Sequence, residues 1–368
     1  MDPPCTQKGS FGPRRFDFPF LCPIATDNLA KLFISRHIRT MKRFPTLLAT
    51  LCLIATAGTT LAKAPIKVYL LVGQSNMVGH GRIEEGKDGV NGAQGSLRHM
   101  VANNTKAYGH LLQDPEKTAT SKWAVRDDVW VWHNNDGPEH GKLNVGFGRS
   151  TINIGPEFGF GHVIGKASDE QVLLIKACWG GKSLAKDFLP PSAAEYPAPK
   201  EPGDAGYYYQ LMLKTYNDAI ANLKKYFPDY DGGTIELAGI VWFQGYNDRF
   251  GGNHESYEVN LAHLIKDLRK EFKSPKLPFV IGETGNDGKP KEGSSAAGVM
   301  NAQKAVTDFK KYPAFRGNVA FVETTGFWRE RDVSPTGGGH HWFGNGESYY
   351  LIGEAMGKAM VGLMEKTK

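Results

Sequence analysis

Short apolar runs alternate with segments of helical periodicity along the chain from residue 65 onward. The apolar runs are rich in β-branched side chains, which is typical of buried strands. They occupy residues 66–72, 172–177, 239–243, 278–282 and 319–322, with a shorter run at 128–132. Residues 209–226, 257–272 and 351–364 carry apolar side chains at the spacing of amphipathic helices. This alternation predicts a three-layer α/β/α sandwich around a central, mainly parallel sheet.

The N-terminal part of the chain has a different pattern. A basic start at Met41, an apolar stretch at 47–57 and small residues near Ala62 and Ala64 indicate a signal peptide over 41–64. The stretch is shorter than the roughly 20 apolar residues of a membrane span, although an uncleaved anchor stays open as the alternative. We expect residues 1–40 to be an unstructured upstream extension and residues 65–368 to form one domain. The protein is then secreted or periplasmic, with no membrane span in the mature chain.

Charge and cysteine content change when this leader is set aside. Five of the six net positive charges of the 368-residue chain lie in the first 62 residues. The remaining body is nearly neutral, which gives no support for nucleic-acid binding. Of the four cysteines only Cys178 follows the leader, so the mature chain has no intramolecular disulfide. Export is therefore predicted from the leader alone.

Three of the predicted strands end in residues suited to acyl transfer. The first strand runs into Gly73-Gln74-Ser75-Asn76-Met77, where a serine at the carboxyl edge of a sheet is a candidate nucleophile. The alternative is that Ser75 and Asn76 only cap the next helix. The second strand is followed by Gly180-Gly181, which allows close backbone approach to a ligand or forms a plain turn. The third leads into Gln244-Gly245-Tyr246-Asn247-Asp248.

Together with His340-His341-Trp342-Phe343 near the C-terminus, these blocks resemble the SGNH-type hydrolases. The similarity is greatest to the branch of sialate O-acetylesterases and acetylxylan esterases of carbohydrate esterase family six. It extends from about Lys67 to the C-terminal helix, and GQSNM is its most specific motif. The resemblance implies an SGNH/flavodoxin-like fold and a serine esterase that needs no metal or organic cofactor.

The resemblance also implies roles for individual residues. Ser75 is the expected nucleophile and His341 the expected base, with His340 as its competitor. Gly181, or its neighbour Gly180, and Asn247 are expected to donate to the oxyanion. Gln74 and Gln244 are expected in the same oxyanion and substrate-binding group. A His-His pair also suits a metal site, but no further ligand spacing accompanies it.

The acid partner of the histidine departs from the family pattern. The family has Asp-x-x-His, whereas Gly338 stands three residues before His341. Tyr246 also replaces a glutamate that the branch usually carries. Asp332 is the expected acid. Asp248, Glu283 and a dyad without any carboxylate remain alternatives, because a triad that loses its acid keeps part of its activity.

The expected function is removal of acetyl groups from a carbohydrate such as acetylated xylan, sialate or a related glycan. A lipase or thioesterase of the same fold is one alternative, and a non-catalytic carbohydrate-binding protein is another. Four tryptophans beside the motif blocks suit sugar rings, although strand tryptophans more often belong to the core. The sugar, the ester position and the oligomeric state are left open.

Overall fold

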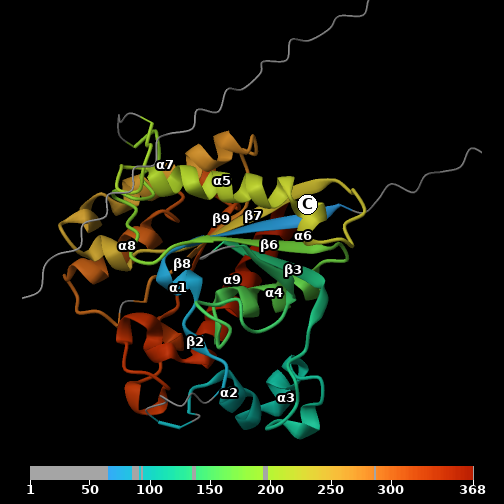
Figure 1. Ribbon diagram of the computed structural model, residues 1–368. Helices are drawn as coiled ribbons and strands as arrows, with labels where there is room; N and C mark the ends of the chain where they lie inside the picture. Colours follow the sequence, from blue (N-terminus) through green and yellow to red (C-terminus); the bar gives the residue numbers. More distant parts are fainter. Residues whose placement is uncertain are drawn as a thin grey trace, which may run out of the picture. The chain divides into compact units, whose positions relative to one another are not determined.

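A computed structural model describes residues 65–84, 91–92, 94–134, 138–193, 198–285 and 287–367. They all belong to one compact unit, Thr60–Lys368 (Figure 1). The predicted extension and signal peptide lie outside the described residues. Within the described ranges, no helix is both long and apolar enough to cross a membrane.

A seven-stranded sheet forms the centre of this unit, in the order β4-β3-β6-β1-β7-β8-β9 (Figure 1). All neighbouring strands are parallel except the edge pair β3 and β4, which is antiparallel. A separate two-stranded ladder joins β2 and β5. The strands are β1 Ile66–Gly73, β2 Gly81–Arg82, β3 Arg126–Asn134, β4 Pro138–Leu143, β5 Asn153–Ile154, β6 Val172–Cys178, β7 Ile235–Phe243, β8 Phe279–Gly282 and β9 Val319–Val322.

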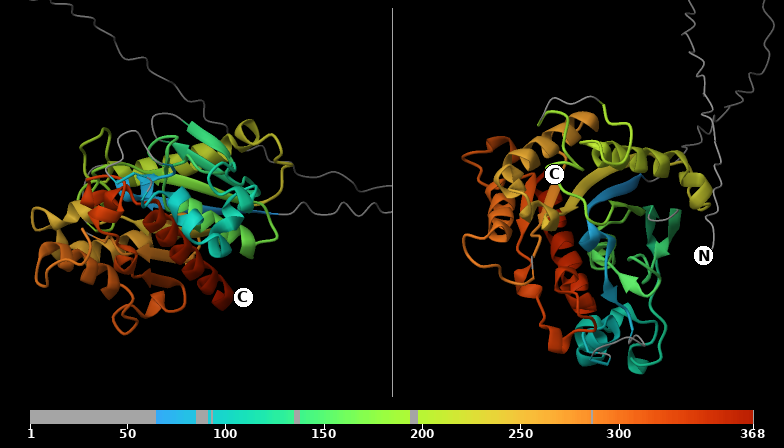
Figure 2. Two further views of the ribbon diagram at one scale, coloured as in Figure 1. Left: turned by 90° about the horizontal axis from the view of Figure 1, so that it is seen from below. Right: turned by 60° about the vertical axis from the view of Figure 1, so that its left-hand side comes forward.

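Helices cover both faces of the sheet, as Figures 1 and 2 show. Apolar side chains of α5 to α8 share one core with one face, and those of α4 and α9 share a second core with the other. The predicted three-layer α/β/α sandwich with a mainly parallel sheet is confirmed. The helices are α1 Ser75–Val78, α2 Leu97–Asn103, α3 Thr105–Tyr108, α4 Pro156–Ala167, α5 Tyr207–Ala221, α6 Leu223–Tyr226, α7 Tyr257–Glu271, α8 Ser295–Ala305 and α9 Gly346–Thr367.

The predicted helix over 209–226 is in fact two helices. The chain leaves helical geometry at Asn222, with φ −106° and ψ 14°, between α5 and α6. The amide of Asn222 donates from its side chain to the carbonyl of Asp218, which caps the end of α5. A side chain that bonds to nearby backbone competes with the helix at this point.

Helix α4 contains three glycines, which lower its helical propensity. Its packing against α9 explains two of the glycines in this pair of helices. A Cβ atom at Gly159 would lie 2.1 Å from the carbonyl oxygen of Tyr350, and one at Gly353 would lie 2.0 Å from that of Pro156. The two backbones therefore touch, and only glycine permits this approach.

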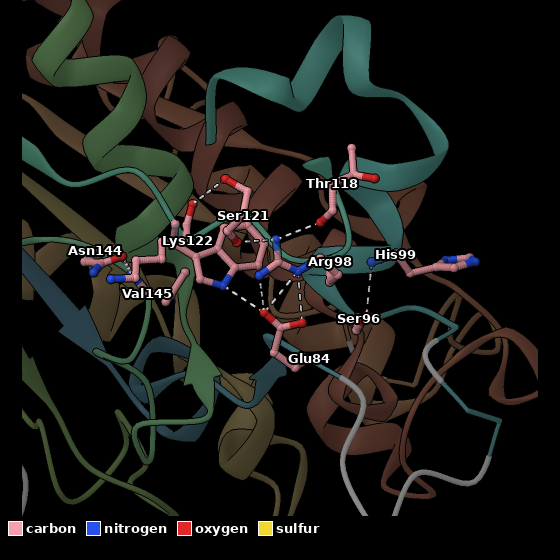
Figure 3. A network of polar contacts seen from close by, with 10 residues as sticks. Glu84, Ser96, Arg98, His99, Thr118, Ser121, Lys122, Asn144 and Val145 are labelled. Atoms are coloured by element: carbon pink, nitrogen blue, oxygen red, sulfur yellow. Dashed lines mark hydrogen bonds and ion pairs between the residues drawn. The ribbon is translucent and has the colours of Figure 1, made fainter. Parts of the chain in front are cut away.

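Arg98 of α2 is the centre of a polar network that joins Glu84 to residues 118–123 (Figure 3). Its guanidinium binds both carboxylate oxygens of Glu84 and donates to the carbonyls of Thr118 and Ser121. It also lies 4.3 Å over the ring of Trp123, whose Nε1 donates to Glu84. A planar guanidinium can satisfy all these partners at once. One arginine side chain thus links Glu84, Thr118, Ser121 and Trp123.

Candidate active site

The candidate site lies where the three central strands end. Gly73 of β1 is in register with Cys178 of β6 and with Phe243 of β7. The residues that follow these strands therefore meet at one edge, the usual ligand edge of an open α/β sheet. A Cβ atom at Gly73 would lie 2.2 Å from the carbonyl oxygen of Phe243, so the close approach of β1 and β7 requires glycine.

Ser75 begins α1 directly after the extended residue Gln74. It is half-buried, whereas Gln74 and Asn76 on either side are buried. Helix α1 is a single turn that ends at Gly79, whose φ of 102° is accessible mainly to glycine. The turn directs the next residues toward β2, so one short segment supplies both Ser75 and His80.

An amide network joins the three strand ends. The Oε1 atom of Gln74 accepts from the backbone N–H of Gly245 at 3.1 Å and of Asn247 at 3.3 Å. Its Nε2 donates to Oδ1 of Asn247 at 3.0 Å, and Nδ2 of Asn247 donates to the carbonyl of Gly181 at 3.0 Å. The structure thus brings Gln74, Gly181 and Asn247 together. An asparagine amide has two N–H groups, so one remains for a ligand after the bond to Gly181.

Gln244 forms the second layer of this network. Its Nε2 donates to Oε1 of Gln74, to the carbonyl of Lys182 and to Oδ2 of Asp248. Gln74 and Gln244 are 2% and 1% exposed, so their amides face protein rather than a substrate. The sequence led us to expect that both glutamines contact the substrate. Their burial instead favours a role in positioning the loops.

A buried ion pair contacts the end of α1, the turn that carries Ser75. Nζ of Lys176, on β6, lies 2.7 Å from Oε2 of Glu157 on α4, and both side chains are 0% exposed. The same Nζ donates to the carbonyls of Val78 at 2.8 Å and Phe147 at 2.5 Å. The other carboxylate oxygen of Glu157 accepts from the N–H of Gly155. Every polar group of the pair is therefore used, which a buried charge requires.

The two histidines lie on a tight loop before α9. Trp342 and Phe343 have φ values of 57° and 52°, a left-handed conformation that is uncommon for large side chains. The buried ring of Trp342 fixes this turn. His340 is exposed, and His341 is half-buried. The ring centroid of His341 lies 3.7 Å from that of His80 at an interplanar angle of 9°. Burial, His340 and Arg149 lower the pKa of His341 to about 4.

The loop is tied to the nucleophile turn through Asn76. Its Nδ2 donates to the carbonyl of His340 at 3.1 Å, and its Oδ1 accepts from the hydroxyl of Tyr349 at 2.7 Å. Asn76, which binds the histidine loop, directly follows Ser75 in the chain, so the two segments are in contact.

In the part of the chain that the structure describes, the three candidate acids are not hydrogen-bonded to the histidine rings. Asp248 is buried and accepts from the backbone N–H groups of Leu184 and Ala185. Glu283 is buried and accepts from those of Thr324 and Thr325. Asp332 is exposed. Among the described residues, no hydrogen bond joins any of the three to His341. The identity of the acid stays a prediction.

An aromatic ledge borders the site. It consists of Tyr246, Arg249 and Phe250, on and just after the 3-10 helix Tyr246–Arg249 that also carries Asn247. The guanidinium of Arg249 lies 3.7 Å over the ring of Tyr246 and 4.8 Å over that of Phe250. It also pairs with Asp287 at 3.1 Å. Phe250 is 55% exposed, which leaves an aromatic face open to solvent.

The tryptophans divide between core and surface. Trp242 and Trp342 are 0% and 1% exposed and belong to the two cores. Trp179 and Trp328 are half-buried. The preference of strand tryptophans for the core therefore holds for Trp242.

Within the described part of the chain, no three His, Cys, Asp or Glu side chains gather as they would around a metal ion.

This edge of the sheet presents a serine turn, adjacent amide donors and a histidine loop, the arrangement of an α/β esterase. The family model "Carbohydrate esterase, sialic acid-specific acetylesterase" matches residues 65–361. The chain belongs to this family and is a carbohydrate esterase.

Individual relatives are more distant. A probable carbohydrate esterase of Arabidopsis thaliana is 25% identical over 220 residues, 59% of this chain and 68% of that protein. A solved Arabidopsis thaliana structure is 17% identical with a TM-score of 0.49, covering 81% of this chain and 98% of that one. A carbohydrate acetylesterase from Xanthomonas citri is 15% identical with a TM-score of 0.45, covering 78% of this chain and 55% of that one.

Sequence reasoning missed His80, the Lys176–Glu157 pair and the aromatic ledge. A signal for the pair was available, because a lysine within the apolar strand run 172–177 must find a buried partner. His80 gave no such signal, since its role depends on a loop more than 250 residues away. Phe250 resembled any exposed apolar residue in a loop.

Lys176→Met tests the buried pair. It should lower the free energy of unfolding by roughly 3–5 kcal/mol, because Glu157 keeps a buried charge without a partner. Lys142→Met is the matched control: Lys142 pairs with Asp127 at 2.7 Å, but the two side chains are 45% and 79% exposed. An exposed pair contributes about 0–1 kcal/mol. Urea unfolding measures both variants, and equal losses would contradict the importance of the buried pair.

Proposed function

We propose that this esterase is a serine acetylesterase that acts on an acetylated carbohydrate, with Ser75 as nucleophile. The register of Gly73, Cys178 and Phe243 is the observation that carries the proposal. It brings Ser75 to the same edge as Gly181 and Asn247, which are themselves hydrogen-bonded to each other. Acyl transfer needs a nucleophile next to donors that can hold an oxyanion.

The proposed reaction has two steps. Oγ of Ser75 attacks the ester carbonyl while His341 takes its proton, and the sugar hydroxyl leaves with that proton. Water then attacks the acetyl-enzyme, again with His341 as base, and releases acetate. The backbone N–H groups of Ser75 and Gly181 and the Asn247 amide hold the oxyanion in both steps.

His341 is proposed as the base in preference to His340. It is the more buried of the two rings, and its loop is tied to Asn76 beside the nucleophile. Its lowered pKa keeps the imidazole neutral at neutral pH, which a general base requires. With Asp332 exposed and Asp248 and Glu283 committed to backbone N–H groups, a Ser75–His341 dyad is favoured over the Asp332 triad.

The aromatic ledge supports a carbohydrate rather than a long acyl chain as the recognised group. Phe250 and Tyr246 stand on the loop that carries Asn247, a few residues from the proposed oxyanion site. Exposed aromatic faces pack against the apolar faces of sugar rings, whereas a lipase needs an enclosed apolar channel. Acetylated xylan, sialate and related glycans all offer such rings.

We further propose that residues 41–64 are a signal peptide and that the mature enzyme is secreted or periplasmic. Residues 1–40 are then an upstream extension outside the folded enzyme, and residues 65–368 are its single domain. N-terminal sequencing of exported protein should give a start near Lys63 or Pro65. A mature chain that keeps residues 1–40 would refute the assignment.

Ser75→Ala tests the proposed reaction. It should lower kcat/KM for 4-nitrophenyl acetate by roughly a thousandfold or more, because the remaining donors only stabilise attack by water. Circular dichroism should show an unchanged fold. Ser168→Ala, at the end of α4, is the control and should keep wild-type turnover. Wild-type turnover in Ser75→Ala would exclude Ser75 as nucleophile.

Phe250→Ala tests the substrate class. It should raise KM for an acetylated xylo-oligosaccharide about five- to tenfold, since an aromatic contact is worth about 1 kcal/mol. KM for 4-nitrophenyl acetate should stay unchanged, because this substrate has no sugar ring. Phe250→Trp should keep the affinity. Val259→Ala removes a side chain of similar exposure, 52%, on α7 and serves as the control. Equal effects on both substrates would argue against a sugar contact.

A further inference from the structure

The rings of His80 and His341 are stacked face to face in van der Waals contact. Their centroids are 3.7 Å apart and their planes differ by 9°. His340 adds a tilted ring 4.1 Å from His341 on the same loop. His80 and His341 also share one wall of a cavity of about 480 Å³, together with Arg82 and Arg149. The proposed base therefore has an aromatic neighbour that is not part of the proposed chemistry.

His80 is held by its backbone on both sides. The carbonyl of Gly79 accepts from the N–H of Arg149 at 2.8 Å, and the carbonyl of His80 accepts from Nδ2 of Asn153 at 3.1 Å. Gly81, the next residue, pairs with Ile154 in the ladder of β2 and β5. His80 lies five positions after Ser75, and Lys176 holds the intervening turn at the carbonyl of Val78. His80 is thus a rigid surface built into the nucleophile segment.

A base needs its ring plane fixed so that one nitrogen points at the nucleophile. A carboxylate on the far ring nitrogen usually does this. Here the described residues include no hydrogen bond between a carboxylate and His341. A parallel stack also fixes the plane, because rotation about the Cβ–Cγ bond would drive the ring edge into His80.

We propose that His80 is a positioning residue, which holds the plane of the His341 imidazole by stacking and keeps water from that face. The inference rests on the proposed role of His341 as base. The ring of His80 would orient the imidazole of His341, as the acid does in a triad. His80 itself touches neither the ester nor Ser75 in this scheme.

Burial lowers the pKa of both stacked histidines. Burial, followed by His341 and Arg149, lowers the pKa of His80 to about 3. The charged and titratable groups around His341 are His80, His340, Arg149 and Arg82, the last of which lines the same cavity. Burial is the first cause of the lowered pKa of His341, so water at its exposed face would raise that pKa toward its usual value of about 6.5.

The test compares His80→Ala, His80→Leu and His80→Phe over pH with 4-nitrophenyl acetate. The acid limb of kcat/KM reports the pKa of the base in the free enzyme. In the wild type we expect this limb near pH 4. Both non-aromatic variants should lose roughly 10- to 100-fold in kcat, with KM little changed, because the base is misplaced. In His80→Ala the limb should also move up toward neutral pH.

His80→Phe should restore most of kcat and the wild-type limb, because it keeps a flat ring without a titrating group. His80→Leu fills a similar space without a ring, so activity equal to that of His80→Phe would overturn the proposal. Unchanged kcat and pH profile in His80→Ala would overturn it as well. His99→Ala on α2 is the histidine control.

His341→Ala separates this inference from the proposed function. If it keeps wild-type activity, His341 is not the base and both proposals fail. If it abolishes activity while His80→Ala and His80→Leu behave as wild type, the esterase mechanism stands and only the role of His80 fails. Both proposals are supported if His341→Ala loses activity and, of the three His80 variants, only His80→Phe keeps it.

Discussion

The buried contact between Lys176 and Glu157 is the constraint on which the site depends. A lysine in the centre of a parallel sheet must find partners within the protein, because desolvating its charge is costly. Its partners are the carboxylate of α4 and the carbonyls of Val78 and Phe147. One side chain thereby fixes the end of α1, the start of α4 and the loop before β5. Val78 lies between Ser75 and His80, so this contact holds the turn that carries both residues.

Side-chain amides link the strand ends at this edge of the sheet. Gln74, Gln244 and Asn247 link three strand ends through side-chain hydrogen bonds that leave both glutamines buried. Where the branch usually carries a glutamate, Tyr246 instead packs against Arg249 and faces His340 at 5.8 Å. The substitution thus exchanges a carboxylate for part of an aromatic surface.

The sequence predicted the elements whose pattern is local. The apolar runs at 172–177 and 239–243 became β6 and β7, and the helical spacing of 257–272 became α7, with boundaries shifted by a few residues. Features whose reason is tertiary did not follow from a local pattern. Gly159 of α4 is explained by the close contact with α9, and β4 is a polar edge strand that follows no alternating pattern. Propensity carries no information on such contacts.

By itself, the sequence determined the fold class and the motif positions, because period and turn residues act within a few residues of the chain. It also indicated that Ser75, Gly181 and Asn247 follow strands, which in a parallel sheet places them at one edge. Only the tertiary structure decided which neighbours those residues have. The stack of His80 on His341, the pairing of Lys176 with Glu157 and the burial of Gln74 join segments far apart in the chain. Such contacts depend on how the layers pack. A lysine in the apolar run 172–177 indicates that a buried partner exists, but no local pattern identifies that partner.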